Sequence, residues 1–295
     1  MRLGVDLGGT KTEIIALGDG DVELLRRRIA SPQGNYRATV EAIAGLVAAA
    51  EGQIGAKGSV GVAIPGTLAG DLIKNANSTW LNGHPLARDL GEALGREIRL
   101  ANDANCFALS EATDGAARGC AVVFGVIAGT GVGGGVVIRG QALAGAHGIA
   151  GEWGHNPLPG MSVEEVAEAP QCYCGRRGCI ETWVSGPALA ADFARHSTFR
   201  LTAAEIATSS DETARAAMTR FTDRFARALG SVMNILDPDA IVLGGGLSNI
   251  ESLYRDLPPL VEIYAFTPGS QPRIVKNVHG DSSGVRGAAW LWPAP

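Results

Sequence analysis

The sequence predicts an α/β protein made of two related halves, and three features of the chain support this. Gly4–Thr10 (GVDLGGT) and Gly125–Gly131 (GVIAGTG) are each an apolar run that enters a Gly/Thr segment and precedes a second apolar run. The rest of the chain alternates between strand-like runs and stretches with helical periodicity. No low-complexity linker interrupts this alternation, as expected for packed α/β lobes.

Each of these two apolar pairs is expected to form a β-hairpin. Residues 119–138, which contain the second pair, carry no charge over 20 residues, a length that could cross a membrane. Seven of these residues are glycine, however. A glycine-rich centre between two Val/Ile runs is typical of two buried strands joined by a flexible turn. We therefore expect a hairpin here and no membrane span.

Between the two hairpins, the periodicity predicts two helices and two strands. Residues 38–54 place apolar side chains on one helical face, and residues 104–117 are a second expected helix. Residues 59–66 and 97–102 are the expected strands. The face of the first helix is formed by Val40, Ile43, Val47, Ala50 and Ile54.

A long amphipathic helix is expected in the second half. Pro238 cannot continue this helix, and residues 240–246 (AIVLGGG) follow as a strand that ends in a glycine turn. The apolar face of the helix is marked by Met218, Phe221, Phe225, Leu229, Val232 and Leu236.

Composition limits the class of protein. The 295 residues are 46% hydrophobic and 19% charged, which suits a globular protein large enough for two cores. The net charge is −5, and Lys and Arg are scattered, so we expect no nucleic acid partner. Five cysteines are an odd number, and Met1 is followed at once by a strand-like run without a signal peptide, so we expect a cytoplasmic protein.

The glycine turns are candidates for a phosphate-binding site. Glycine lets the backbone approach phosphate oxygens, and exposed N–H groups in a turn attract anions. Asp6 is a candidate for holding Mg²⁺, while Lys11 or the turn N–H groups would face phosphate. The alternative is that DLGGTK is only a tight hairpin turn, but a second copy and a third glycine turn favour a bound nucleotide. The nucleotide and Mg²⁺ site is predicted at Asp6, Gly8, Gly9, Thr10, Lys11, Gly129, Thr130, Gly131, Gly244, Gly245 and Gly246.

Seven motifs, in order along the chain, resemble the ROK family of repressors, open reading frames and sugar kinases. This resemblance implies an actin-like ATPase (ribonuclease H-like) fold of two lobes, each with a mixed β-sheet flanked by helices, and a zinc-binding loop. It implies a small lobe of residues 1–118, joined by a C-terminal helix at 281–295, and a large lobe of residues 119–280. The motifs are DLGGTK, AIPG, ANDAN, GTGVGGG, GEWGH, CYCGRRGCIE and IVLGGG.

The cysteine motif is the most specific part of the resemblance. Cys172, Cys174 and Cys179 follow the spacing C-x-C-x4-C, and with His155 they offer three thiolates and an imidazole, a complete tetrahedral zinc shell. Four protein ligands leave no open position, so the zinc is expected to be structural. The alternative is a set of buried free cysteines.

Asp103 is the candidate catalytic base. It lies where a strand-like segment ends and a helix begins, so its carboxylate can face a cleft and accept the proton of an attacking hydroxyl. Taken alone, it would more commonly cap the helix. The resemblance implies that the sugar site consists of Gly66, Asn77, Asn102, Asp103, Glu152, His155 and Glu181. Outside the motifs, a turn for Gly66, a loop amide for Asn77 and surface charges for the glutamates are the simpler interpretations.

The resemblance implies ATP-dependent phosphorylation of a hexose. Similarity to bacterial fructokinases and mannokinases through KNANSTWLNG (residues 74–83) and HGDSSGVRGAAWLW (residues 279–292) predicts fructose as the preferred acceptor, phosphorylated at its 6-hydroxyl, with mannose second and glucose poor. Glucokinase and N-acetylhexosamine kinase are the alternatives within the family. We expect ATP, Mg²⁺ and structural Zn²⁺ as cofactors, and a homodimer.

Two other function classes belong to the same fold. Repressors of the family carry a helix-turn-helix before the first glycine turn, and here that turn begins within ten residues of Met1. A non-catalytic sugar sensor is the remaining alternative, although it would not need Asp6, Lys11 and Asp103 together.

Overall fold

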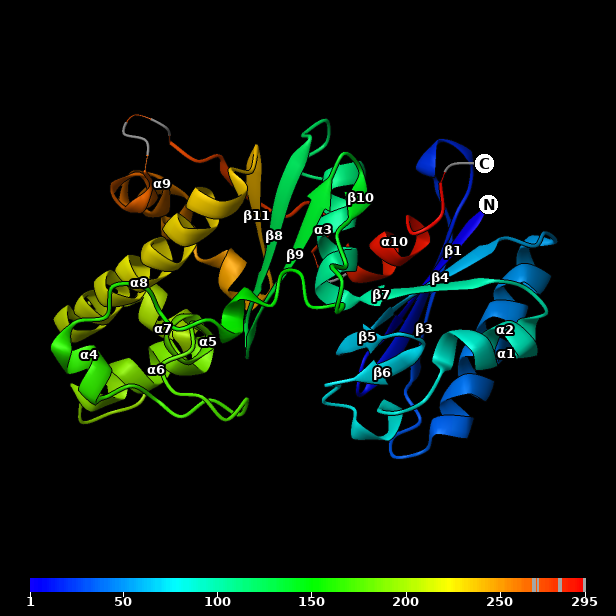
Figure 1. Ribbon diagram of the computed structural model, residues 1–295, viewed down its shortest axis with the longest axis horizontal. Coiled ribbons are helices and arrows are strands. Elements are labelled where there is room, and N and C mark those ends of the chain that lie inside the picture. Colours follow the sequence, from blue (N-terminus) through cyan, green and yellow to red (C-terminus); the bar gives the residue numbers. More distant parts are fainter. Residues whose placement is uncertain (267–268, 270, 281–282, 294–295) are drawn as a thin grey trace.

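A computed structural model describes residues 1–266, 269, 271–280 and 283–293. The chain forms two lobes, each built on a five-stranded mixed sheet (Figure 1). The first sheet has the order β3-β2-β1-β4-β7. Its strands are β1 (Arg2–Leu7), β2 (Lys11–Leu17), β3 (Glu23–Ala30), β4 (Ser59–Ile64) and β7 (Ile98–Asn102). In the same lobe lie η1 (Asp19–Asp21), α1 (Tyr36–Ile54), the pair β5 (Thr67–Ala69) and β6 (Leu72–Lys74), η2 (Thr79–Leu81) and α2 (Leu86–Leu94).

The second sheet repeats this arrangement with the order β10-β9-β8-β11-β12. Its strands are β8 (Val122–Ala128), β9 (Val132–Ile138), β10 (Gln141–Ala142), β11 (Ala240–Gly244) and β12 (Ile274–Lys276). Around it lie η3 (Trp153–His155), α4 (Val163–Ala167), α5 (Glu181–Val184), α6 (Gly186–Arg195), α7 (Ala203–Thr208), α8 (Glu212–Leu236), η4 (Gly246–Asn249) and α9 (Ser252–Tyr264).

The two predicted hairpins are confirmed. β1 pairs antiparallel with β2, and β8 pairs antiparallel with β9 in the same way. The uncharged stretch at 119–138 therefore forms two strands of a sheet, buried mainly among apolar side chains. None of the described helices is long and apolar enough to cross a membrane.

The long helices also lie where the apolar periodicity predicts them. α1 begins after Asn35, whose side chain accepts a hydrogen bond from the N–H of Ala38, and ends at Gly55 in the left-handed conformation. It buries Ile43 and Val47 against the first sheet. α8 buries its Phe and Leu face in the core of the second lobe.

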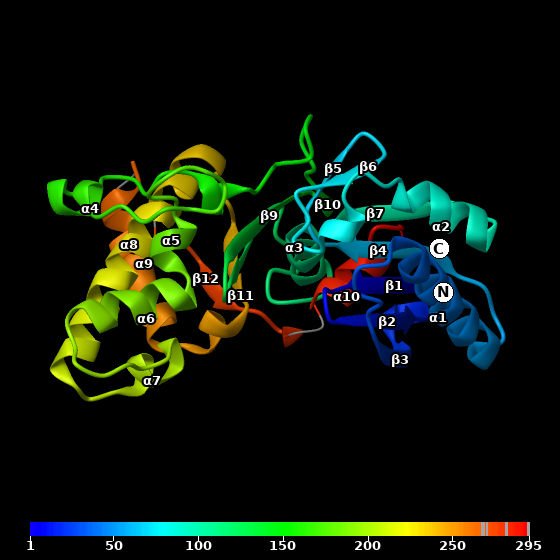
Figure 2. The same cartoon turned by 90° about the horizontal axis from the view of Figure 1, so that it is seen from below.

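Two helices lie between the sheets: α3 (Asp103–Thr113) and α10 (Ser283–Ala289) (Figure 1 and Figure 2). α10 packs on β1, β4 and α3. Gly287 permits this close crossing, because a Cβ there would lie 1.7 Å from the carbonyl oxygen of Cys106. α3 falls in the range predicted for the first lobe, yet its apolar side chains pack with β8, β9 and β11. The boundary between residues 118 and 119 stays a prediction.

The C-terminal helix predicted over 281–295 is shorter in the structure, where α10 ends at Ala289. After this point the chain turns, and the indole N–H of Trp292 donates to the carbonyl of Val60 at 2.7 Å. Pro293, which follows, is unfavourable within a helix. The remaining ends of that prediction, residues 281–282 and 294–295, lie outside the described residues.

Candidate active site

The first glycine turn closes the β1–β2 hairpin. The N–H of Gly8 donates to the carbonyl of Lys11 at 3.0 Å, and the hydroxyl of Ser31 donates to the carbonyl of Gly8 at 2.7 Å. Thr10 and Lys11 are exposed, and Asp6 is half-buried near the end of β1. The turn therefore presents a cation to solvent and keeps a carboxylate at its base.

The second and third glycine turns lie against each other in the other lobe. Gly245 has a φ of 77°, and a Cβ on it would lie 2.5 Å from the carbonyl oxygen of Ala128. The two turns open into a cavity of about 770 Å³. Its lining includes Gly129, Thr130 and Gly246 together with residues of α6 and α7. This volume falls in the range of small-molecule and cofactor sites.

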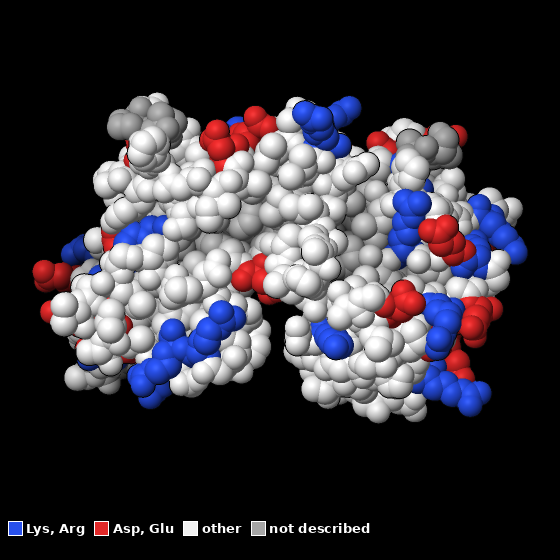
Figure 3. All heavy atoms as spheres, viewed as in Figure 1, with Lys and Arg blue, Asp and Glu red and all other residues white. Residues whose placement is uncertain are grey.

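Asp6 and Asp103 share one electrostatic environment, although they come from different elements. Burial, followed by the negative charges of Asp103 and Glu13, raises the pKa of Asp6 from 3.8 to about 7. Asp103 is accessible to solvent, yet surrounding protein displaces enough bulk water to raise its pKa. Figure 3 shows a notch between the two lobes, and the Lys and Arg visible on that face lie in separate groups on either side of it. Two carboxylates with raised pKa values are typical of a site that receives a cation or a proton.

Asn102, not Asp103, caps α3. The side-chain oxygen of Asn102 accepts from the N–H of Ala104 at 2.9 Å, and its amide nitrogen donates to the carbonyl of Gly66 at 2.7 Å. The capping role that was the alternative for Asp103 therefore belongs to Asn102. One oxygen of Asp103 also accepts from the N–H of Ala104, at 2.8 Å. Asn102 therefore caps a helix and binds the carbonyl of Gly66, and Gly66 adopts a positive φ of 79°, whether or not either residue contacts a sugar.

The predicted sugar residues of the second lobe lie near one another. Removal from water raises the pKa of Glu152; the charge of His155 lowers it in part, and that of Glu181 raises it again. Asp103 belongs to the same group, because the charge of Glu152 contributes to its raised pKa. Asn77 is exposed between β6 and η2, and within the described part of the chain no hydrogen bond joins it to these carboxylates.

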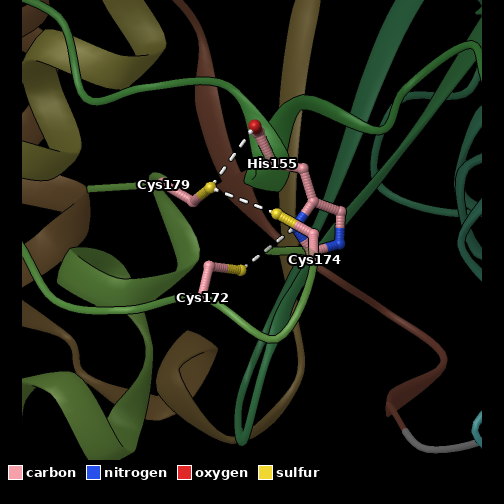
Figure 4. A group of neighbouring side chains, drawn as sticks. All are labelled: His155, Cys172, Cys174 and Cys179. Carbon is pink, nitrogen blue, oxygen red and sulfur yellow. Dashed lines mark hydrogen bonds between the residues drawn. The ribbon is translucent and has the colours of Figure 1, made fainter. Parts of the chain in front are cut away.

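The predicted zinc residues come together in one cluster. His155 ends η3, and the three cysteines lie on the loop between α4 and α5 (Figure 4). One ligand atom from each of the four residues lies within 4.8 Å of all the others. The Sγ atoms of Cys174 and Cys179 are 3.6 Å apart, too far for a disulfide, and Nδ1 of His155 is 3.6 Å from Sγ of Cys172.

These distances fit a tetrahedral zinc ion. Zn–S bonds of about 2.3 Å at tetrahedral angles place ligand atoms roughly 3.7 Å apart. The backbone N–H of Arg176 is the main group that lowers the pKa of Cys174, to about 6, which favours the thiolate that a metal requires. The remaining two cysteines behave as expected of core residues: Cys106 is fully buried, and Cys120 is partly buried among apolar side chains.

Two contacts in this region could not be read from the motifs. One oxygen of Glu181 accepts from the N–H of Val132 at 2.9 Å, so the cysteine loop supports the second glycine turn. The hydroxyl of Tyr173, inside the cysteine motif, lies 2.9 Å from Nε2 of His155. The position of Tyr173 between two predicted ligands was the only sequence signal for the second contact.

A family model and several relatives match nearly the whole chain. A model described as the ROK family matches residues 2–294. The N-acetyl-D-glucosamine kinase of Pectobacterium carotovorum subsp. carotovorum (strain PC1) is 41% identical over 302 residues, which cover 99% of this chain and 98% of that relative. The N-acetyl-D-glucosamine kinase of Shigella flexneri serotype 5b (strain 8401) is 40% identical over 300 residues, with 99% of both chains covered.

A solved structure agrees with these sequence matches. The crystal structure of a ROK hexokinase from Thermus thermophilus superposes with a TM-score of 0.85 at 31% identity, covering 98% of this chain and 96% of that one. Because the family match, the relatives and this structure all span nearly the whole chain, the chain belongs to the ROK family.

Proposed function

We propose that the chain is an ATP-dependent hexose kinase in which Asp103 is the general base that accepts the proton of the 6-hydroxyl. One observation carries the proposal: Asp103 is electrostatically linked to Asp6 at the first glycine turn and to Glu152 beside the cysteine loop. A base in that position lies between a site for phosphate and a site for sugar hydroxyls. In-line transfer requires that arrangement, because positioning supplies most of the rate enhancement.

The nucleotide is proposed to lie in the cavity next to Gly129, Thr130 and Gly246. Asp6 would hold Mg²⁺, which supplies positive charge to the phosphates when bound. The first turn brings backbone N–H groups and Lys11 to the same phosphates. Zinc would be held by His155 and the three cysteines, where it fixes the loop that carries Glu181. A homodimer stays a prediction.

We propose N-acetyl-D-glucosamine as the first candidate acceptor, because relatives at about 40% identity along the whole chain carry that activity in their names. The comparisons do not support the predicted preference for fructose. The segments behind that prediction have structural roles. Asn82 closes the loop at 75–82 through both backbone groups of Ala76, and residues 283–289 form the helix between the sheets. Fructose is the second candidate, favoured only by the resemblance of residues 74–83 to fructokinases.

The experiment is ADP release by the zinc-containing protein with ATP and Mg²⁺ over a panel of acceptors: N-acetylglucosamine, glucose, mannose and fructose. We expect the highest kcat/KM for N-acetylglucosamine. A highest value for fructose or mannose would reject the first candidate and leave the kinase assignment in place. No ADP release with any acceptor would reject the kinase and favour a sugar sensor.

A further inference from the structure

Tyr173 is a polar group without an assigned role, and it contacts His155, one of the predicted sugar residues. It lies between Cys172 and Cys174, and its side chain is 82% exposed. Its ring meets the ring of His155 edge-on, with centroids 5.1 Å apart and an interplanar angle of 87°. Its hydroxyl oxygen is 2.9 Å from Nε2 of His155. An exposed tyrosine held by one hydrogen bond to a histidine can contact a bound ligand without repacking a core.

The direction of that hydrogen bond follows from the zinc cluster. Nδ1 of His155 faces the cysteines, so its lone pair is the one available to a metal. Nε2 then carries the proton and donates to the hydroxyl oxygen of Tyr173. The tyrosine still has its own O–H, and among the described residues no acceptor takes it.

The predicted sugar site includes the carboxylates of Glu152 and Glu181. A tyrosine phenol keeps its proton at neutral pH, because its ordinary pKa is about 10. Ionised carboxylates can accept from the hydroxyls of a sugar, but they cannot donate. An oxygen of the substrate that carries no proton needs a donor, and the O–H of Tyr173 can be one.

We propose that Tyr173 is a specificity-determining residue whose hydroxyl donates a hydrogen bond to a substrate oxygen that bears no proton. Two oxygens have this chemistry: the carbonyl of an N-acetyl group and the ring oxygen of any hexose. The inference rests on the proposed function only in placing a sugar beside Glu152 and Glu181. It does not depend on phosphoryl transfer.

The test measures sugar binding by isothermal titration calorimetry without ATP, using Tyr173→Phe with its zinc content determined. Phenylalanine keeps the ring and removes only the hydroxyl. Tyr264→Phe is the matched control, because its hydroxyl bonds Asp223 on α8 and lines a different cavity. Loss of one hydrogen bond is expected to weaken sugar binding about 3- to 10-fold. Zinc content and Tm should match wild type, and Tyr264→Phe should bind sugar normally.

The acceptor panel separates the two oxygens. A loss confined to N-acetylglucosamine assigns the bond to the acetyl carbonyl, whereas an equal loss for N-acetylglucosamine, glucose and mannose assigns it to the ring oxygen. Unchanged dissociation constants for every sugar, or loss of zinc from Tyr173→Phe, would overturn the proposal. If wild type binds sugars in this pattern but releases no ADP, the kinase assignment fails while the role of Tyr173 stands. Wild type that binds no hexose would overturn both.

Discussion

The two sheets have the same strand order and orientation, but their first turns differ in charge. β1 carries Asp6 two residues before Gly8, whereas β8 carries Ile127 two residues before Gly129. Both turns offer backbone N–H groups, which attract phosphate without adding charge. Asp6 is the carboxylate proposed to hold Mg²⁺, whereas the carboxylate at the second turn, that of Glu181, comes from another segment and accepts from the N–H of Val132. The backbone arrangement thus occurs twice, but only the first of these two strands carries an acid at this position.

The largest effect is expected from a substitution that removes the general base and leaves both glycine turns intact. Asp103→Asn keeps the shape of the side chain but cannot accept a proton, so we expect kcat to fall about 10²- to 10⁴-fold. Sugar binding measured by calorimetry should stay within about 2-fold of wild type, the usual range for a change that removes no buried contact. Near-normal turnover in the folded variant would remove Asp103 from the mechanism.

The second effect concerns the contact between Glu181 and the second turn; the first turn is supported by Ser31 instead. Cys179→Ser removes one of the four predicted zinc ligands, and we expect it to loosen the loop that leads to Glu181. We expect zinc affinity to fall at least ~10-fold, with Tm and activity falling together. Cys120→Ser is the control, because Cys120 lies outside the cluster. Fully active protein that contains no zinc in metal analysis would contradict this.

The third prediction tests the charged turn through pH. Burial raises the pKa of Asp6 in the folded protein to about 7, against about 4 for an aspartate in an unfolded chain. Between these values the folded state binds more protons than the unfolded chain, so the free energy of unfolding falls as pH rises from about 4 to 7. Asp6→Asn should remove about 1 to 4 kcal/mol of this dependence, measured by urea unfolding across pH without Mg²⁺. An identical pH profile in the variant would assign the titration to another group.

The smallest effects are expected from alanine substitutions that compare the two glycine turns directly. A Cβ on Gly131 would lie 2.6 Å from the carboxylate of Glu181, which is anchored to Val132, whereas a Cβ on Gly9 would meet only Ser78 at 3.3 Å. Gly131→Ala should therefore weaken binding of a non-hydrolysable ATP analogue about 5- to 10-fold, and Gly9→Ala by about 2-fold or less. Equal losses would show that the second turn does not depend on its contact with Glu181.

The sequence predicts the parts of the fold that repeat or have a long period. The two hairpins, α1 and α8 follow from apolar patterns that span many residues, and the zinc cluster follows from ligand types and spacing. The unpredicted elements are mostly short: β5, β6, α4 and α7 have three to six residues each, too few to show a period. α7 packs on α6 and α8, and β5 pairs with β6; a single sequence does not reveal such contacts.

The site shows the same division. The motifs predict Asp103, Glu152, His155 and Glu181 as site residues, and the structure brings these residues near one another. The contact of Tyr173 with His155 depends on how the cysteine loop folds back on η3, which no local pattern encodes. The preferred acceptor also cannot be predicted from local sequence patterns. The two segments that suggested fructose have structural roles, because Asn82 closes a loop and residues 283–289 form α10.

The most direct measurement is a crystal structure of the zinc-containing protein with N-acetylglucosamine, Mg²⁺ and a non-hydrolysable ATP analogue. A general base must lie within hydrogen-bonding reach of the proton that it accepts, about 2.6 to 3.2 Å between heavy atoms. We predict that distance between a carboxylate oxygen of Asp103 and the 6-hydroxyl, with the triphosphate between the first two glycine turns. A 6-hydroxyl that points away from Asp103, with another carboxylate in reach, would contradict the proposed mechanism.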